Sequence, residues 1–187
     1  MGKIKVTANK IKGLYVIEPT VYEDGRGYFF ETYNQRDFFD AGLTMKFVQD
    51  NQSKSKKGVL RGMHFQNKYP QGKLVRVIRG EVFDAAVDVR PNSETFGQWF
   101  GVVLSEKNKL QFYVPEGFAH GFLVMSEEAE FAYRCTEFYH PEDEGGIIWN
   151  DPDIGIKWPI ENESEVQLAK KDMELPKFKE WNEMRQK

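Results

Sequence analysis

The sequence contains one cysteine, Cys135, in 187 residues, so no disulfide can form within the chain. It also has no apolar run approaching the roughly 20 residues that a membrane-spanning helix needs. The first ten residues, MGKIKVTANK, lack the apolar core of a secretory signal. Together these absences predict a cytoplasmic protein, in the reducing compartment of the cell, with no membrane partner.

The chain has no excess of positive charge. Its 26 Lys and Arg residues are outnumbered by 29 Asp and Glu residues, and the pI is near 5.7. Because surfaces that bind nucleic acid are strongly basic, we do not expect nucleic acid as a partner. The glycine-rich phosphate loops of Rossmann and P-loop proteins are also missing, so the sequence gives no sign of a nicotinamide cofactor.

Short segments rich in valine, isoleucine, phenylalanine and tyrosine dominate the chain, which is typical of β-strands. Strands are expected at 13–22, 26–33, 45–53, 73–80, 81–90, 99–105, 111–117, 120–126 and 130–139. Helices are expected at 34–42, where Asn34 can cap the first turn and Gly42 suits the end, and at 176–186. Without a linker or repeat, this pattern predicts one mainly β domain over residues 1–187, built as a sandwich, jelly roll or small barrel.

Alternation along a strand sorts the side chains onto two faces. Tyr133 and Tyr139 fall on one apolar, inward face of the last expected strand. Asp84 and Asp88 share the mixed face of another strand, where two carboxylates repel each other. They are either a functional pair or, more simply, partners of arginines on a neighbouring strand. The candidates for those arginines are Arg76, Arg79 and Arg90.

The chain has three histidines. His64 lies in GVLRGMHFQ and His120 in PEGFAHGF, both glycine-rich and apolar, whereas His140 precedes a proline in a charged loop and is expected at the surface. A catalytic zinc usually has three protein ligands close together. Gln66 stands where a second histidine would complete a His-x-His pair, and an amide is a poor substitute. The residues alone therefore leave open a catalytic base, a core histidine, or a metal site made by His64, His120 and one carboxylate.

Arg61 and His64 are three positions apart, so a regular strand would direct their side chains to opposite faces. Gly62 lies between them, and glycine within a strand often marks a β-bulge. We therefore expect a bulge that brings both side chains to one side. A regular ladder through residues 60–66 would contradict this expectation.

Several longer motifs follow one another in a definite order. They are DGRGYFFETYNQ (24–35), RGMHFQ (61–66), QGKLVRVIRGEVFDAAVDVR (71–90), TFGQW (95–99), PEGFAHGF (115–122), WNDPDIGIKWP (149–159) and LAKKD (168–172). PEGFAHGF resembles the second motif of the cupins, and the whole set resembles one branch of them, the dTDP-4-dehydrorhamnose 3,5-epimerases. The resemblance implies a cupin-like double-stranded β-helix, or jelly-roll barrel, with short peripheral helices. It also implies an isomerase that needs no metal and no other cofactor.

The resemblance implies a reaction and the residues that perform it. The family inverts C3 and C5 of dTDP-4-dehydro-6-deoxy-D-glucose, whose C4 ketone acidifies the hydrogens on both carbons. The product, dTDP-4-dehydro-L-rhamnose, leads to cell-surface polysaccharide. By matching position, His64 is the base, Asp172 its carboxylate partner and Tyr133 the acid on the opposite face. Lys73 matches a residue beside the developing enolate oxygen.

The resemblance also implies which residues of this chain contact the substrate. Tyr139 matches the aromatic residue on which the thymine base stacks. The other matching positions are Arg26, Glu31, Gln49, Asp50, Asn51, Arg61, Lys73, His120, Glu144 and Lys171. Arginine suits a diphosphate because its planar group can bind two oxygens at once. Without the family, Arg26 and Glu31 are equally well explained as a surface pair, and Tyr133 as a core tyrosine.

Two positions depart from the family pattern: Phe138, where many members have tyrosine, and Ala169, where serine is expected. They leave room for a relative that inverts only C3 or only C5, or that acts on a different nucleotide 4-keto sugar. A sugar-binding module or a metal-dependent cupin is the remaining alternative. The family is homodimeric, with N-terminal strands exchanged between barrels, so the resemblance implies a homodimer here.

Overall fold

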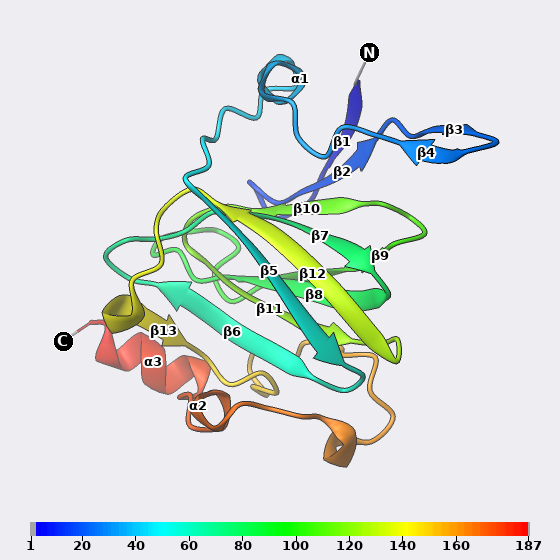
Figure 1. Cartoon of the computed structure of the whole chain (residues 1–187). Coiled ribbons are helices and arrows are strands. Elements are labelled where there is room, and N and C mark those ends of the chain that lie inside the picture. Colours follow the sequence, from blue (N-terminus) through cyan, green and yellow to red (C-terminus); the bar gives the residue numbers. More distant parts are fainter. Residues whose placement is uncertain (1–2, 187) are drawn as a thin grey trace.

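Two antiparallel β-sheets packed face to face form the body of the molecule, as the computed structural model of residues 3–186 shows (Figure 1). The six-stranded sheet has the order β1 (Ile4–Ala8), β2 (Tyr15–Pro19), β10 (Gln111–Val114), β7 (Lys73–Arg79), β12 (Glu128–Cys135) and β5 (Gln49–Lys56). The five-stranded sheet has the order β13 (Glu144–Gly146), β6 (Leu60–Gln66), β11 (Phe118–Val124), β8 (Glu81–Asp88) and β9 (Trp99–Ser105). This arrangement confirms the expected mainly β jelly roll.

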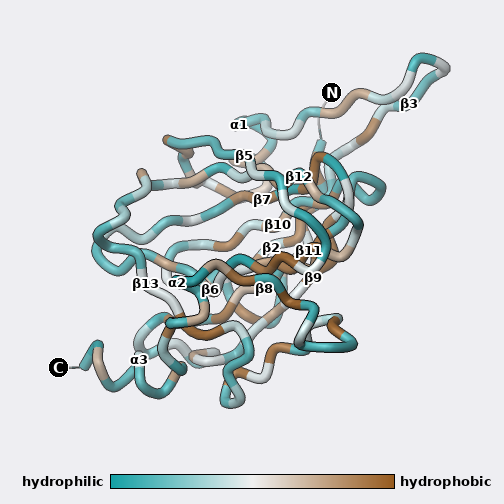
Figure 2. The backbone as a smooth tube through the Cα atoms, turned by 60° about the horizontal axis from the view of Figure 1, so that its bottom comes forward, coloured by the Kyte–Doolittle hydropathy of each residue, from teal (hydrophilic) through white to brown (hydrophobic). Residues whose placement is uncertain are grey.

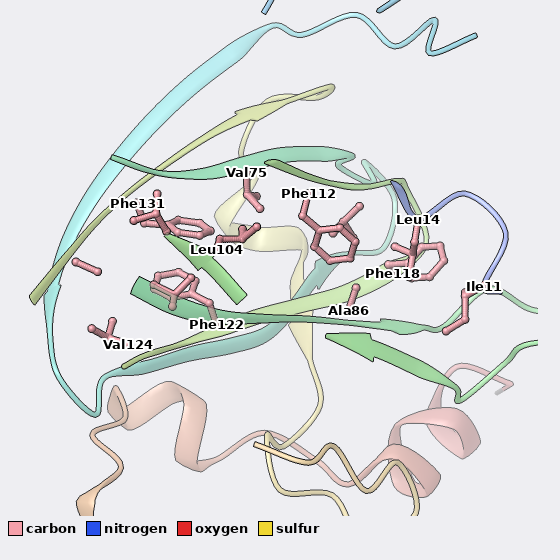
Figure 3. Close-up of a cluster of buried hydrophobic side chains, with 14 residues drawn as sticks. Ile11, Leu14, Val75, Ala86, Leu104, Phe112, Phe118, Phe122, Val124 and Phe131 are labelled. Atoms are coloured by element: carbon pink, nitrogen blue, oxygen red, sulfur yellow. The ribbon is translucent and has the colours of Figure 1, made fainter. Parts of the chain in front are cut away.

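The main hydrophobic core lies between the two sheets, because each sheet turns its apolar alternate residues inward (Figure 3). Phe122 of β11 stacks on Phe131 of β12 with the ring centroids 4.1 Å apart, and this contact joins the sheets. Burying an aromatic side chain of this size stabilises a fold by roughly 2–3 kcal/mol. Tyr133 packs against the same cluster, which confirms the inward face expected for it.

The remaining elements are peripheral. The hairpin β3 (Tyr22–Asp24) and β4 (Gly27–Phe29) projects from the body, and α1 (Gln35–Asp40) lies above the six-stranded sheet (Figure 1). The other short elements are η1 (Pro141–Asp143), η2 (Glu163–Glu165), α2 (Lys170–Met173) and α3 (Phe178–Met184). Figure 2 shows apolar colour concentrated in the central strands and polar colour at the hairpin tip. Among the described residues, no helix has the length and apolar character needed to cross a membrane.

Both expected helices are present, and the first begins as expected, with the Asn34 side chain accepting a hydrogen bond from the backbone N–H of Arg36. The largest differences between the expected and the observed strands concern three segments. The expected strand at 26–33 is reduced to β4, because it forms only a short hairpin. The expected strand at 130–139 ends at Cys135, so Tyr139 lies in a loop and does not share a strand face with Tyr133. The edge strand β1 was not predicted at all.

Strand β6 contains the expected bulge. His64 pairs with His120 of β11 and Arg61 pairs with Phe122, so three steps along β6 match two along β11. Gly62 permits this because its φ is +127° and because a Cβ there would lie 2.6 Å from the Cα of Gly121. The bulge therefore directs both Arg61 and His64 toward the space between the sheets.

Candidate active site

A cavity of about 570 Å³ opens between the two sheets, close to β5, β6 and β12. A volume of this size suits a ligand larger than a simple sugar. The cavity is lined by most of the residues expected at the site, namely Gln49, Asn51, Arg61, His64, Lys73, His120, Tyr133, Tyr139, Glu144, Lys171 and Asp172. Residues scattered over more than 120 positions of sequence are thus brought together in one place.

His64 is joined to Asp172, 108 positions away in the sequence, by a hydrogen bond of 2.7 Å from its Nε2 atom. The backbone of α2 places the Asp172 carboxylate under β6, where it also accepts a bond of 3.5 Å from the N–H of Gly62. Burial alone would raise the pKa of Asp172, but these bonds and Lys171 lower it below its ordinary value. An ionised Asp172 keeps a proton on Nε2 and leaves Nδ1 of His64 as the ring nitrogen that can accept one.

Tyr133 faces the same cavity from β12, on the opposite sheet. Burial raises the pKa of Tyr133, and the neighbouring Cys135 and Glu144 raise it further. The hydroxyl group is therefore kept protonated and can donate. A base and an acid come from opposite walls of one cavity.

Lys73 begins β7 and adds a positive charge to the wall that carries Tyr133. Burial lowers the pKa of Lys73, although Cys135, Glu144 and Asp84 act in the opposite direction. An ammonium group that has lost water interacts more strongly with an anion formed beside it. The position therefore suits stabilisation of an oxyanion in the cavity.

His120 of β11 and Asp84 of β8 form a second histidine–carboxylate pair, in which Asp84 is fully buried and His120 reaches the cavity wall. The Nε2 atom of His120 lies 2.8 Å and 3.0 Å from the two carboxylate oxygens. Burial raises the pKa of Asp84, while His120 and Lys73 partly offset this. The expectation of an arginine partner was wrong for Asp84. Its register partner on β11 is Phe122, and the carboxylate is bound by His120, which lies two residues before Phe122 on the same face of that strand. Asp88 does bind one of the expected arginines, Arg90, at 2.6 Å, but Arg90 follows it by two residues in the chain and is not on a neighbouring strand.

Three polar side chains are linked at the mouth of the cavity. The Glu144 carboxylate accepts a bond of 2.6 Å from Lys171 and one of 3.3 Å from the Tyr139 hydroxyl. Burial raises the pKa of Tyr139, and Glu144 raises it further. Tyr139 is 47% exposed as a residue and lines the cavity, so its ring is accessible to a planar group that enters there.

A family model described as dTDP-4-dehydrorhamnose 3,5-epimerase matches residues 8–180 of this chain. The enzyme of that name from Methanothermobacter thermautotrophicus is 55% identical to the chain over 172 residues, which are 92% of this chain and 93% of the relative. The chain belongs to the dTDP-4-dehydrorhamnose 3,5-epimerase family. As a member it is an isomerase, and the family predicted from the motifs is confirmed.

Solved structures of family members have the same fold. The epimerase from Elizabethkingia anophelis gives a TM-score of 0.90 at 53% identity, covering 96% of this chain and 98% of that one. The epimerase from Legionella pneumophila, solved in complex with dTDP-4-keto-L-rhamnose, gives 0.89 at 50% identity, covering 93% and 92% of the two chains. The cupin-like barrel of the epimerase family is therefore confirmed for this chain.

Three residues expected at the epimerase site do not line the cavity of their own chain. Arg26 lies at the tip of the β3–β4 hairpin, where it binds Asp24 at 2.6 Å. Glu31 follows the hairpin, and one of its carboxylate oxygens accepts a bond of 3.1 Å from Asn34. Asp50 points to the outer face of its sheet, where it meets Arg134 at 3.3 Å. The roles expected for them stay predictions.

Within residues 3–186, no group of three or more His, Cys, Asp or Glu side chains is arranged to hold a metal ion. His64 and His120 each bind a carboxylate of their own instead of converging on one point. Gln66, at the position where a metal-binding cupin would have a second histidine, bonds to backbone groups. His140, expected at the surface, is half-buried and stacks on Tyr69 at 4.1 Å.

Sequence reasoning missed Asp84 as the partner of His120. A signal was present, because each is a polar residue inside an otherwise apolar strand and such groups are satisfied when buried. It also missed Gln66 and Gln71 as groups that hold the loop after β12. Gln71 donates a bond of 2.7 Å to the backbone carbonyl of Glu137. No local pattern in the sequence indicates these contacts, since they depend on how two sheets meet.

Proposed function

We propose that the chain inverts both C3 and C5 of dTDP-4-dehydro-6-deoxy-D-glucose and releases dTDP-4-dehydro-L-rhamnose. The observation that carries this proposal is the opposition of the His64–Asp172 pair, on one sheet, to Tyr133, on the other sheet, across a single cavity. Inversion at a carbon requires removal of hydrogen from one face and delivery of hydrogen to the other. The two walls supply these two functions.

His64 removes the proton. Its Nδ1 atom accepts hydrogen from C3 or C5, and the electron pair left on carbon moves into the carbonyl, giving an enolate with its charge on O4. Asp172 stabilises the imidazolium that forms, because the 2.7 Å bond to Nε2 becomes a charged pair. Because Asp172 is buried and His64 is partly buried, water and salt screen this pair less than they would an exposed one.

Lys73 stabilises the enolate, because its ammonium lines the cavity from β7, the strand that pairs with the Tyr133 strand β12. Tyr133 then gives its proton to the opposite face of the carbon, the carbonyl re-forms, and the configuration is inverted. The resulting phenolate regains a proton, and the imidazolium loses one, before the second carbon reacts. No electrons are lost or gained overall, so the chemistry requires no redox cofactor.

The nucleotide occupies the mouth of the cavity. Tyr139 offers an exposed ring face for the thymine base, while Arg61 and Lys171 offer positive charge for the diphosphate. The side chain of Arg61 is held by two bonds of 3.1–3.2 Å to the buried hydroxyl of Ser55. These two bonds fix the guanidinium without neutralising it, so that it remains available to an anion.

We further propose that the functional unit is a homodimer of single-domain chains in the cytoplasm. The projecting β3–β4 hairpin supports it, because Tyr28 and Phe29 are 58% and 60% exposed there. A second copy would cover these rings and would receive Arg26 and Glu31 near its own cavity. The unpaired thiol of Cys135 suits a reducing compartment.

Product analysis tests the proposed function. The purified protein is incubated with dTDP-4-dehydro-6-deoxy-D-glucose, with and without a chelator, and the ring proton couplings of the product are read by NMR. We expect the couplings of the doubly inverted sugar, unchanged by the chelator. Inversion at one carbon would restrict the function to a single-position epimerase, and an unchanged sugar would contradict it.

A further inference from the structure

The segment that carries Tyr139 is held by side chains rather than by a β ladder. Strand β12 ends at Cys135, and residues 136–140 have no strand or helix of their own. The backbone N–H of Tyr139 donates a bond of 2.9 Å to the side-chain oxygen of Gln49. A loop fixed in this way would move if those side chains were altered, and its exposed aromatic ring would move with it.

Gln66 supplies the other bonds on both sides of Tyr139. Its Nε2 atom donates to the carbonyl of Phe138 at 3.1 Å, and its Oε1 atom accepts from the N–H of His140 at 2.8 Å. With the Gln49 contact, three of the four polar atoms in the two peptide groups that flank Tyr139 are therefore bound by two glutamine side chains. The arrangement replaces a strand pairing at this point.

Gln66 also belongs to the strand that carries the proposed base, His64. It is the last residue of β6, two positions after His64, and its side chain is only 6% exposed. Its Nε2 atom makes another bond, of 2.5 Å, to the carbonyl of Tyr69, whose ring stacks on His140. The amide thus uses both of its donor hydrogens and its acceptor, which no other side chain of this length can do.

We propose that Gln66 is a positioning residue for nucleotide binding: it ties the strand that carries His64 to the loop that carries Tyr139, and so sets the ring of Tyr139 at the cavity mouth. This inference rests on the proposed function, because it assigns Tyr139 to the nucleotide. Gln66 itself need not touch the substrate. It acts through the backbone on either side of Tyr139.

The substitution Gln66→Glu tests this assignment, since a carboxylate of the same shape keeps the acceptor for His140 but has no donor for Phe138 or Tyr69. Gln98→Glu, at an exposed position outside the cavity, adds the same charge and serves as the matched control. Binding of dTDP is measured by calorimetry, and KM and kcat by NMR assay. We expect Gln66→Glu to raise the Kd for dTDP and the KM about tenfold, with kcat within about twofold of wild type. Gln98→Glu should change none of these values.

A double-mutant cycle with Tyr139→Ala separates positioning from a general structural effect. In the Tyr139→Ala background, Gln66→Glu should weaken dTDP binding no further, because the ring that it positions is gone. Gln66→Asn, whose shorter amide cannot reach all three backbone groups, should behave in the same way and decides the matter if Gln66→Glu fails to fold.

Three results would overturn the inference. They are an unchanged Kd for dTDP in both Gln66 variants, a loss of kcat at constant KM, or fully additive effects in the cycle. The proposed function fails separately: a wild-type protein that neither binds dTDP nor converts the sugar would contradict it, whatever the variants do.

Discussion

At the scale of single residues, the Asp172 carboxylate determines which ring nitrogen of His64 can accept a proton. The imidazole has one ring nitrogen hydrogen-bonded to a buried carboxylate whose pKa is lowered, and that carboxylate is also bonded to the Gly62 backbone. Its ionised form therefore selects the tautomer in which Nδ1 can accept a proton. Asp172 thus determines which side of the His64 ring can remove a proton from the substrate.

The substitution Asp172→Asn should therefore reduce kcat by roughly 10³- to 10⁴-fold, because an amide N–H facing Nε2 favours the wrong tautomer of His64. Binding of dTDP, measured by calorimetry, should stay close to that of wild type, since the fold and the cavity mouth are unaffected. A variant with nearly normal kcat would show that Asp172 is not needed for the base.

Tyr133→Phe keeps the ring of Tyr133 in the core but removes the acid. Hydrogen removal by His64 should continue, whereas inversion should fall by at least about 10²-fold because no group delivers a proton to the opposite face. Solvent exchange and product formation, followed together by NMR, measure the two steps. An equal loss of both would make Tyr133 a positioning group.

Among the elements, the turn after β8 is organised by one carboxylate. Asp88 accepts bonds of 2.6 Å from Arg90, Ser93 and Thr95, and it is fully buried. Burial would raise the pKa of Asp88, but these bonds lower it from 3.8 to about 2. Because the folded pKa lies below the unfolded one, the stabilisation is complete above about pH 4 and is lost as the pH falls toward 2.

Asp88→Asn should accordingly lower the free energy of unfolding by about 2 kcal/mol at pH 7, and by progressively less as the pH falls below about 4. Urea denaturation at fixed protein concentration measures this, with the exposed Asp40→Asn as control. A penalty that stays constant down to pH 2 would mean that the Asp88 charge does not contribute.

Local patterns predicted some elements well. The first helix was predictable because Asn34 and its turn are neighbours in sequence, and the bulge because Gly62 separates two residues of opposite parity. The edge strand β1 was not, since its short sequence becomes a strand only by pairing with β2.

The candidate site, like the fold, was predictable from the sequence only in part. Motifs identified the residues of the cavity, but the Asp84–His120 pair and the role of Gln66 depend on contacts between strands and loops distant in sequence. Periodicity gives the face of a strand on which a residue lies, not its partner on the next strand.

On one side of the molecule the β3–β4 hairpin projects from the body, and its Tyr28 and Phe29 side chains are largely exposed, although Lys109 lies over the Tyr28 ring at 3.8 Å (Figure 1). Exposed apolar rings gathered on one projection are typical of an interaction surface. The proposed homodimer covers them and brings Arg26 toward a second cavity. Catalysis would then depend on association even though each chain has its own base and acid.

Replacing Tyr28 and Phe29 together by serine should shift the protein from dimer to monomer in light scattering and raise the KM, while each chain stays folded because both rings are exposed. Phe39→Ser, which removes an aromatic ring that is 39% exposed on α1, is the control. A doubly substituted protein that remains dimeric with a normal KM would place the interface elsewhere.

In the proposed mechanism, His64 on one cavity wall removes a proton and Tyr133 on the other wall delivers one. The most direct test of this mechanism is proton NMR of dTDP-4-dehydro-6-deoxy-D-glucose with the protein in deuterated water. We predict loss of both the C3 and C5 proton signals with the wild-type protein, and retention of both with His64→Asn, which should still bind dTDP. Exchange that continues in His64→Asn, or no exchange in wild type, would contradict the assignment of His64 as the base.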